Sequence, residues 1–415
     1  MRWLQHHWYR ITPLHLILFP ISLLFGALVA LRRALYRSRI LRGEKLPVPV
    51  VVVGNISVGG TGKTPLTLAL AQQLINRGWH PLIISRGYGG AAQQPQRANA
   101  GSDTRQVGDE PLLMAQRNIC PVWVGRDRAA TARAALQTHP QCDVVLCDDG
   151  LQHYRLRRDV EIAVIDGARG LGNGWLLPAG PLREPASRLQ AVDAVVVNMQ
   201  ARSPHPNLPP VMPSPQSSSE TTGETTSHLT RLSKNDSQVI GYSHSTKHAS
   251  VQVAGYPASG RGGKREEQSL IPANESLREF QFDGGNAPAG QYSMRLAGEI
   301  FHNLRDPEKT VSAAYFSALN NHAVAGIGHP QRYFQHLKTL GIPFTPHAFP
   351  DHHPYSAADL GFTGCDAILM TEKDAVKCAA FADEKYWVLR VDARIDSALT
   401  DHILRKIAPH GRQTA

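Results

Sequence analysis

Residues 48–74 of the chain are VPVVVVGNISVGGTGKTPLTLALAQQL, an apolar run followed by a glycine-rich turn and an amphipathic stretch. This order predicts a buried strand, a loop and a helix. The turn matches GxxxxGK(S/T) except at the first glycine, where Ser57 stands. In such loops the backbone amides point at phosphates, so the turn predicts a nucleotide site; a turn without a ligand is the alternative.

The roles expected within this loop follow from the chemistry of phosphate binding. We expect Lys63 to reach the β and γ phosphates and to act in catalysis, and the Thr64 hydroxyl to ligate Mg2+. The expected nucleotide-binding residues are Ser57, Val58, Gly59, Gly60, Thr61, Gly62, Lys63 and Thr64.

Two adjacent acids supply a second expected feature. Residues 144–147 are apolar and predict a buried strand, and Asp148 and Asp149 follow at its carboxyl end, where ligands of open α/β sheets collect. Adjacent carboxylates repel each other unless a cation lies between them. We therefore expect Asp148 and Asp149 to hold Mg2+ together with Thr64, with a solvated acidic turn as the alternative.

Short β-branched runs alternate with helical stretches after the first forty or so residues, which predicts an α/β fold with a P-loop NTPase-like parallel sheet. Residues 201–288 are rich in Pro, Ser, Thr and Gly and predict a disordered insert. The expected organisation is an N-terminal membrane-associated helix at 1–40, the P-loop domain at 41–200, the insert, and a smaller α/β domain at 289–415. The expected strands are Val48–Val53, Leu82–Ser85, Val122–Val124, Val144–Cys147, Ile162–Ile165, Ala194–Val197, Tyr292–Leu296, Ala323–Ile327, Phe344–Ala348, Ala367–Met370 and Trp387–Val391.

Composition narrows the class of protein. With 415 residues and 42% hydrophobic residues, the chain can build cores for two or three domains. Its formal charge of +10 favours an anionic partner, but charge alone does not choose between phospholipid, nucleotide and nucleic acid. Its 5 cysteines form no CxxC pair, so neither a zinc site nor a disulfide framework is expected, and a reducing compartment fits best.

Residues 14–31, LHLILFPISLLFGALVAL, contain no charged side chain and predict a membrane-contacting segment. Because Pro20 would kink a spanning helix, a shallow interfacial helix is as well supported as a span. A cleaved signal peptide is disfavoured because basic residues follow the run, and a buried core helix is the remaining alternative. A basic cluster follows this run and consists of Arg32, Arg33, Arg37 and Arg39. Because the anionic cytoplasmic leaflet attracts such a cluster, both membrane interpretations place the next domain in the cytoplasm.

Eight motifs in series resemble the tetraacyldisaccharide 4'-kinases, the lipid A 4'-kinases of Gram-negative bacteria. The resemblance covers nearly the whole chain except the insert. It implies a kinase that uses ATP and Mg2+ to phosphorylate the 4' hydroxyl of a tetraacylated glucosamine disaccharide 1-phosphate at the cytoplasmic face of the inner membrane. The expected partners are thus this lipid and the membrane surface, with no nucleic acid and no protein partner inferred. The motifs are VVVGNISVGGTGKTP, SRGYGG, VGDEP, DDGLQH, PAGPLREP, AGIGHPQRYF, FPDHHPY and LMTEKDAVK.

The resemblance also implies site residues. Asp109 and His352 would form the dyad that deprotonates the lipid hydroxyl, and Arg183 and Glu184 would belong to the active site. A carboxylate-oriented imidazole can accept such a proton. From the residues alone, Asp109 is better explained as a helix cap before a proline. Either histidine could be an ordinary loop residue, and the choice between His352 and His353 stays open.

Two motifs carry weaker signals. Arg86 follows a predicted strand and could meet phosphate or simply be solvated. TEKD at 371–374 resembles the base-reading NKxD element of GTPases only faintly, so guanine specificity is not expected. A regulatory or metal-delivering P-loop NTPase and a nucleotide-binding membrane scaffold remain as rivals to the kinase. The NTPase would hydrolyse nucleotide without phosphorylating a lipid, and the scaffold would tolerate loss of Asp109, His352 and Glu184.

Deletion of residues 202–285 is expected to leave the activity intact. The composition of this segment offers too little apolar surface to offset the entropy of ordering it. Kinase assays on the purified deletion variant test this, and complete loss of soluble, active protein would contradict it.

Overall fold

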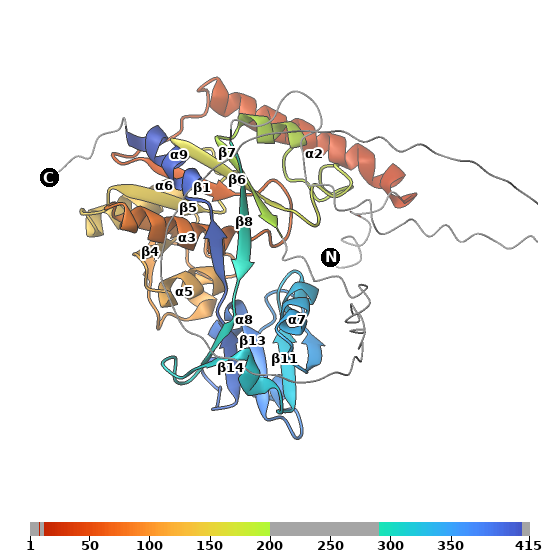
Figure 1. Ribbon diagram of the computed structural model, residues 1–415. Coiled ribbons are helices and arrows are strands. Elements are labelled where there is room, and N and C mark those ends of the chain that lie inside the picture. Colours follow the sequence, from red (N-terminus) through yellow and green to blue (C-terminus); the bar gives the residue numbers. More distant parts are fainter. Residues whose placement is uncertain (1–7, 9–11, 200–289, 409–415) are drawn as a thin grey trace, which may run out of the picture. The chain divides into compact units, whose positions relative to one another are not determined.

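The computed structural model describes residues 8, 12–199 and 290–408, and the predicted insert at 201–288 lies outside them. The described chain contains two separate β-sheets with helices packed on them (Figure 1). The expected α/β class is confirmed. Each of the eleven expected strands has a counterpart whose ends differ by at most two residues.

The larger sheet has nine strands and carries the phosphate loop. Its central strands run parallel and are fully buried, as expected for valine-rich strands covered on both faces. The two edge strands pair antiparallel with their neighbours. In spatial order the strands are β15 (Asp392–Ile395), β8 (Gln291–Ala297), β7 (Ala194–Met199), β6 (Val160–Asp166), β1 (Val50–Gly54), β5 (Val144–Asp148), β2 (Pro81–Ser85), β4 (Val122–Val124) and β3 (Gln96–Ala98).

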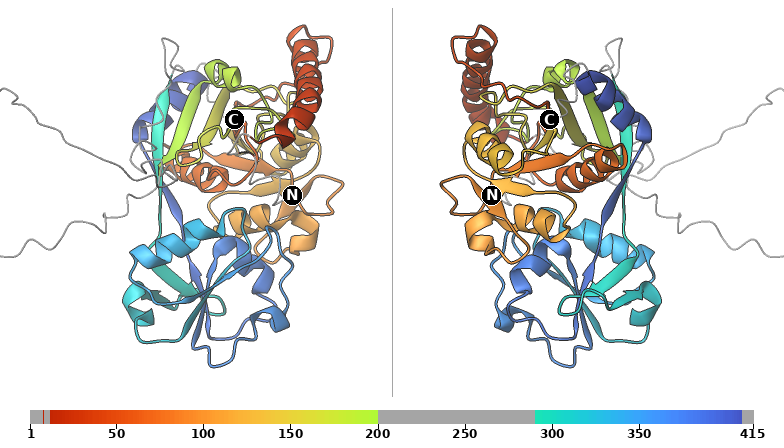
Figure 2. Two further views of the ribbon diagram at one scale, coloured as in Figure 1. Left: turned by 90° about the vertical axis from the view of Figure 1, so that its right-hand side faces the viewer. Right: turned by 90° about the vertical axis from the view of Figure 1, so that its left-hand side faces the viewer.

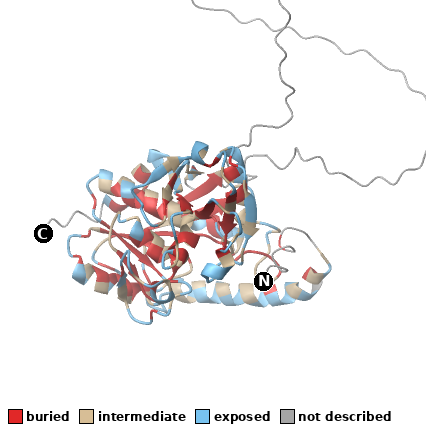
Figure 3. Cartoon of the chain, turned by 90° about the horizontal axis from the view of Figure 1, so that it is seen from below, coloured by how far each residue is buried: buried red, intermediate tan, exposed pale blue. Residues whose placement is uncertain are grey.

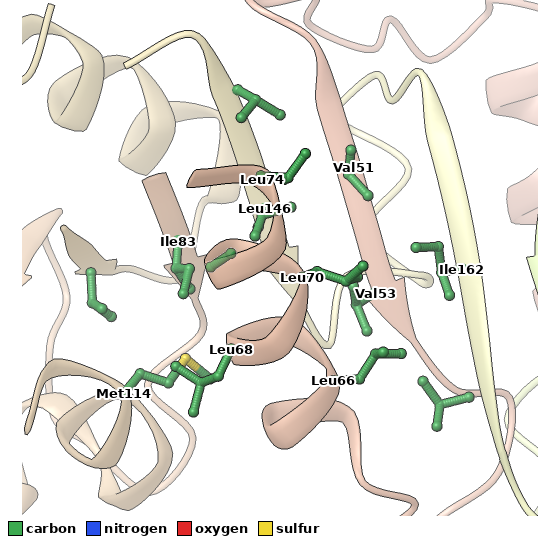
Figure 4. Packing of buried hydrophobic residues seen from close by; sticks show 14 of the residues in the cluster. Val51, Val53, Leu66, Leu68, Leu70, Leu74, Ile83, Met114, Leu146 and Ile162 are labelled. Carbon is green, nitrogen blue, oxygen red and sulfur yellow. The ribbon is translucent and has the colours of Figure 1, made fainter. Parts of the chain in front are cut away.

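Helix α3 (Lys63–Asn76) fixes the position of the phosphate loop because it packs directly on this sheet. Its buried leucines at 66, 70 and 74 recur every four residues and form one apolar face. Figure 4 shows this face against Val51 and Val53 of β1 and Leu146 of β5. The same core includes side chains of α5 (Asp109–Gln116) and α9 (Ser397–Ile407), whereas α6 (Arg128–Thr138) contributes to the core on the other face.

The smaller sheet has six strands and carries α7 (Pro330–Thr339) and α8 (Glu372–Cys378). Its core is rich in aromatic side chains, and the ring of Phe316 contacts those of both Phe301 and Trp387. In spatial order the strands are β10 (Thr310–Ser312), β9 (Ile300–Asn303), β14 (Tyr386–Leu389), β13 (Ala367–Thr371), β11 (Asn321–Ala325) and β12 (Thr345–Ala348).

The predicted boundary at residue 289 does not coincide with the division between the sheets. Strands β8 and β15 and helix α9 all belong to the nine-stranded sheet, although they follow the predicted boundary. The chain therefore crosses from one sheet to the other at 298–299 and returns at 390–391 (Figure 2). A strand's alternating pattern does not say which neighbour it pairs with, so the sequence could not locate this division.

Four strands were not expected from the sequence. Strands β3, β9, β10 and β15 have three or four residues each, and several of their side chains are exposed. Runs this short present too few alternations for a period to be recognised.

The N-terminal helix α2 (Leu14–Arg37) has two different apolar faces. One face packs on the loop after β6, where the Ser22 hydroxyl donates to the Leu176 carbonyl and Phe19 lies against Trp175. The opposite face is exposed (Figure 3), so the core-helix alternative does not hold. By length and composition alone, α2 could cross a membrane. The exposed stripe comprises Ile17, Ile21, Leu24, Leu28 and Leu31.

Substituting Arg117 with methionine should lower the free energy of unfolding by about 3 kcal/mol, because it leaves buried hydrogen-bond acceptors without a donor. Arg117 closes α5, is 7% exposed, and contacts Glu372, Asp392 and the Val391 carbonyl at 2.7 to 2.9 Å. The matched control is Arg77→Met, which removes an ion pair of a 40% exposed arginine with Asp401 and should cost less than about 1 kcal/mol. Urea unfolding of both variants measures the difference, and equal costs would contradict the argument.

Candidate active site

The glycine-rich loop joins buried β1 to the first turn of α3. Gly59 and Gly62 adopt positive φ angles of 108° and 95°. A Cβ at Gly62 would lie 2.6 Å from the Met294 side chain, so both conformation and space require glycine there. Gly62 is also the N-cap of α3, and no side chain caps that first turn. The backbone amides of the first turn of α3 therefore face outward, and this end of the helix can bind an anion.

Ser57 takes the position of the missing first glycine without strain. Its backbone forms an antiparallel bridge with Leu182, an extended conformation that any residue adopts. On either side, Arg183 N–H donates to the Ile56 carbonyl at 2.7 Å and Val58 N–H donates to the Pro181 carbonyl at 2.8 Å. The PAGPLREP motif thus supports the loop from one side.

Asp148 is the most deeply buried acid beside the loop. It ends β5, has no exposed surface, and accepts from the Thr67 hydroxyl of α3 at 3.3 Å through Oδ1. Its Oδ2 is buried and has no hydrogen-bond partner among the described residues. Burial, with smaller contributions from Glu110 and Asp149, raises the pKa of Asp148 to about 7. An unpaired buried oxygen of this kind fits a cation ligand.

Asp149 differs from its neighbour in both backbone and charge environment. It adopts a positive φ of 48°, a conformation that is uncommon for residues other than glycine and that clusters at active sites. Lys63 Nζ lies 3.6 Å and Arg183 Nη1 lies 3.3 Å from its carboxylate. Although burial alone would raise the pKa of Asp149, these two cations hold it below its usual value.

Asp148 and Asp149 suit Mg2+ better than a metal ion whose ligands all come from protein side chains. Within the described ranges no three His, Cys, Asp or Glu side chains cluster as a metal site. Asp148, Asp149 and the Thr64 hydroxyl offer hard oxygen ligands, and Mg2+ commonly completes its shell with water and substrate phosphates. The residues present therefore fit this ion.

Asp109 and His352 meet although 243 positions separate them in the chain. The Nδ1 atom of His352 lies 3.0 Å from Oδ2 of Asp109. His352 has a positive φ of 60°, and its ring packs on Tyr88 with centroids 5.2 Å apart. Burial alone would raise the pKa of Asp109, but the His352 hydrogen bond and the charges of Lys377 and Lys373 lower it.

The helix-cap explanation of Asp109 needs correction. Gly108, with a φ of 88°, is the N-cap of α5, and Asp109 is its first helical residue. The Asp109 side chain binds His352 instead of capping the helix. His353 lies elsewhere, 3.5 Å from Asp359, and its ring meets Phe349 at a tilt and Tyr355 edge to face.

The segment carrying His352 lies close to the phosphate loop. A Cβ on Gly328, in the loop before α7, would lie 3.7 Å from the Gly60 amide and 3.4 Å from Oδ2 of Asp351. Asp351 directly precedes His352. The phosphate loop, the loop before α7 and the segment carrying His352 are therefore consecutive neighbours in space.

Glu184 lies in a buried cluster of side chains. Its carboxylate accepts from the Tyr154 hydroxyl and pairs with Arg188 at 3.2 Å. Arg183, one residue earlier, points instead to Asp149. The two residues that the resemblance places together thus have different surroundings, and Glu184 contacts other protein side chains.

Four residues near the loop were given no role by the sequence. Arg169 donates to the Gly60 carbonyl and pairs with Asp166 at the end of β6, and Arg332 of α7 pairs with the same carboxylate. Asn198 at the end of β7 donates to the Thr61 carbonyl at 3.0 Å. Arg332 lies in AGIGHPQRYF, but a single arginine in a motif does not reveal its partner.

The TEKD motif does not resemble a base-reading element in its contacts. Thr371 caps α8 by accepting from the Asp374 amide, and buried Asp374 accepts from the Gly326 amide at 3.1 Å. Lys373 projects to the Asp109–His352 pair. Arg86 is exposed and lines a small hollow of about 170 Å³ with Tyr88 and Arg126.

Comparisons with known proteins show what the chain as a whole is similar to. The model of the LpxK family, tetraacyldisaccharide-1-P 4'-kinase, matches residues 14–259 and 263–408. A tetraacyldisaccharide 4'-kinase of Methylobacillus flagellatus is 41% identical over 98% of this chain and 96% of its own length. That of Azoarcus sp. BH72 is 42% identical over 99% and 96%. A crystal structure of LpxK from Aquifex aeolicus in complex with ATP has a TM-score of 0.64 and 25% identity, covering 95% of this chain and 99% of that chain.

At about pH 8 and without divalent cations, replacing Asp148 should raise the free energy of unfolding, whereas replacing Asp149 should lower it. Asp148 has a folded-state pKa above its unfolded value, so the protein loses stability as the pH rises towards 7. Asp148→Asn should therefore stabilise the protein at pH 8 by about 1 kcal/mol or more, with a smaller effect near pH 5. Asp149, whose pKa is lowered, contributes stability above its unfolded pKa, so Asp149→Asn should destabilise. Urea unfolding with a chelator present measures both; destabilisation by Asp148→Asn would contradict the argument.

Proposed function

The chain belongs to the tetraacyldisaccharide-1-P 4'-kinase family, and from this premise we infer that it transfers the γ-phosphoryl group of ATP to the 4' hydroxyl of a tetraacylated glucosamine disaccharide 1-phosphate. It is an enzyme of lipid A biosynthesis. The roles of individual residues are our proposal, built on the contacts described above.

The observation that carries the proposal is the 3.0 Å contact between His352 and Asp109 next to a phosphate loop. A carboxylate-oriented imidazole beside a phosphate loop can accept the proton of a hydroxyl that attacks the γ-phosphorus. A lipid kinase benefits from such a base because a sugar hydroxyl is a weak nucleophile at neutral pH.

In the proposed reaction the 4' oxygen bonds to the γ-phosphorus while the bond from that phosphorus to the bridging oxygen breaks, and ADP leaves. The hydroxyl proton passes to Nε2 of His352, whose Nδ1–H is held by Asp109. Lys63 and the amides of the first turn of α3 stabilise the charge of the phosphoryl group. Arg183 orients Asp149, which it contacts at 3.3 Å.

We propose that Thr64, Asp148 and Asp149 hold Mg2+. When bound, the ion would neutralise phosphate charge and orient the triphosphate. The unpaired Oδ2 of Asp148 supports this assignment, because a buried carboxylate oxygen without a donor is costly unless a cation meets it.

We place the enzyme at the cytoplasmic face of the inner membrane, with α2 as its anchor. The exposed apolar stripe of α2 suits the acyl region of a bilayer, and the basic residues that end the helix suit anionic headgroups. The lipid substrate would then reach the site without leaving the membrane surface.

Purified protein incubated with γ-labelled ATP and tetraacyldisaccharide 1-phosphate should place label in the lipid fraction. His352→Gln and Lys63→Ala should each lower the rate by about a hundredfold or more, because one loses the proton acceptor and the other a cation on the phosphoryl group.

His353→Gln is the matched control for His352→Gln, since its ring contacts Asp359 rather than Asp109. It should keep a rate close to that of the unsubstituted protein. Label only in free phosphate, or equal losses in the two histidine variants, would refute the assignment.

A further inference from the structure

Lys373 of α8 contacts the ring of His352 but has no role in the proposed mechanism. Its ammonium lies 3.2 Å from Nε2 of His352, 3.3 Å from Oε1 of Glu110 and 3.3 Å from Oδ1 of Asp351. These are three acceptors for the three N–H groups of an ammonium. The lysine is therefore fully hydrogen-bonded, and one of its bonds points at the ring nitrogen that would take the substrate proton.

We propose that Lys373 is a positioning residue that keeps Nε2 of His352 unprotonated and available as a base. The proposal rests on the proposed kinase reaction, because it concerns the same proton acceptor. A ring N–H at Nε2 would face an ammonium N–H, donor against donor. The arrangement therefore selects the neutral imidazole with its proton on Nδ1, where Asp109 accepts it.

The charges around the ring explain why a cation is needed there. Asp109 contacts Nδ1 of His352, and Oδ1 of Asp351 lies 3.9 Å from Nε2. Each ring nitrogen of His352 therefore has a carboxylate near it. Lys373 balances the carboxylate charge on the Nε2 side, where its ammonium lies 3.3 Å from Oδ1 of Asp351, and Lys377 lies 3.9 Å from Asp109 on the other side.

The ammonium is held firmly as a cation by its surroundings. Burial alone would lower the pKa of Lys373, but the carboxylates of Glu110, Asp351 and Asp109 raise it. The side chain is 17% exposed, so little water competes for its protons. Glu110 belongs to α5 and Asp351 to the segment before His352, so the lysine also ties together the two segments that supply the dyad.

The geometry also shows how the base is released. Nε2 of an imidazole has a single in-plane lone pair, so Lys373 and a substrate hydroxyl cannot both donate to it. When the hydroxyl takes this place, the ammonium keeps its bonds to Glu110 and Asp351. Lys373 thus holds the imidazole ready for the acceptor and gives way to it with the loss of one hydrogen bond.

The test combines nitrogen NMR of the full-length protein, carrying 15N-labelled histidine, with kinetics of lipid phosphorylation. In the unsubstituted protein the His352 Nε2 signal should be that of an unprotonated nitrogen at about neutral pH. In Lys373→Met it should become that of a protonated nitrogen over the same range. A protonated Nε2 in the unsubstituted protein would overturn the proposal whatever the variants do.

The kinetic arm separates this role from a merely structural one. Lys373→Met should lower kcat/KM by about tenfold or more at neutral pH, and the loss should shrink as the pH rises and the imidazolium releases its proton. Lys373→Arg, which keeps a cation, should restore part of the rate. Lys385→Met, at a lysine paired with Asp383 at 3.7 Å, is the control and should match the unsubstituted protein.

A double substitution identifies the route of the effect. In an Asp109→Asn background, Lys373→Met should cost much less than it does alone, because both act through one imidazole. The proposal would be overturned if the two substitutions lowered kcat/KM independently, or if Lys373→Met lowered it equally at every pH. If the unsubstituted protein labels no lipid, the proposed function fails, yet the nitrogen signals still decide the role of Lys373.

Discussion

The first turn of α3 leaves its backbone amides without a side-chain cap, and the rest of the site depends on this. Serine, threonine, asparagine and aspartate are preferred at the start of a helix because their side chains satisfy these amides. Here Gly62 occupies the cap position in a left-handed conformation, and no acidic residue stands in the first turn. A capping side chain would fill the place of a phosphate oxygen. The cost of the open turn is offset by the leucine face of α3, buried against β1 and β5.

The loop before that turn is held by its neighbours from several directions. Arg169 binds the Gly60 carbonyl, Asn198 binds the Thr61 carbonyl, and residues 181–183 run beside residues 56–58. These contacts fix a backbone that glycine alone would leave flexible. They come from the ends of β6 and β7 and the segment after β6, so the sheet itself positions the loop. Asp148 lies at the carboxyl end of the parallel strand β5, on the same side of the sheet as these contacts, so nucleotide and metal ion can meet there.

The sequence predicted the parts of the protein whose pattern is local. Buried strands such as β1 and β5 are continuous apolar runs, and the phosphate loop has its own spacing of glycine, lysine and threonine. It could not predict contacts between distant segments. Neither the bond between Arg332 and Asp166 nor the approach of Lys373 to His352 leaves a trace in nearby residues. Even the Asp109–His352 pair was expected only through a family resemblance, since its residues alone favoured a cap.

The extended bridge between Ser57 and Leu182 has a consequence for recognising such proteins. Because that loop position lies in ordinary extended backbone, nothing in its geometry selects for glycine, and a hydroxyl-bearing residue is accommodated. A search that insists on glycine there would pass over this chain. The positions that geometry does constrain are Gly59 and Gly62, so a pattern anchored on these two would detect more distant relatives.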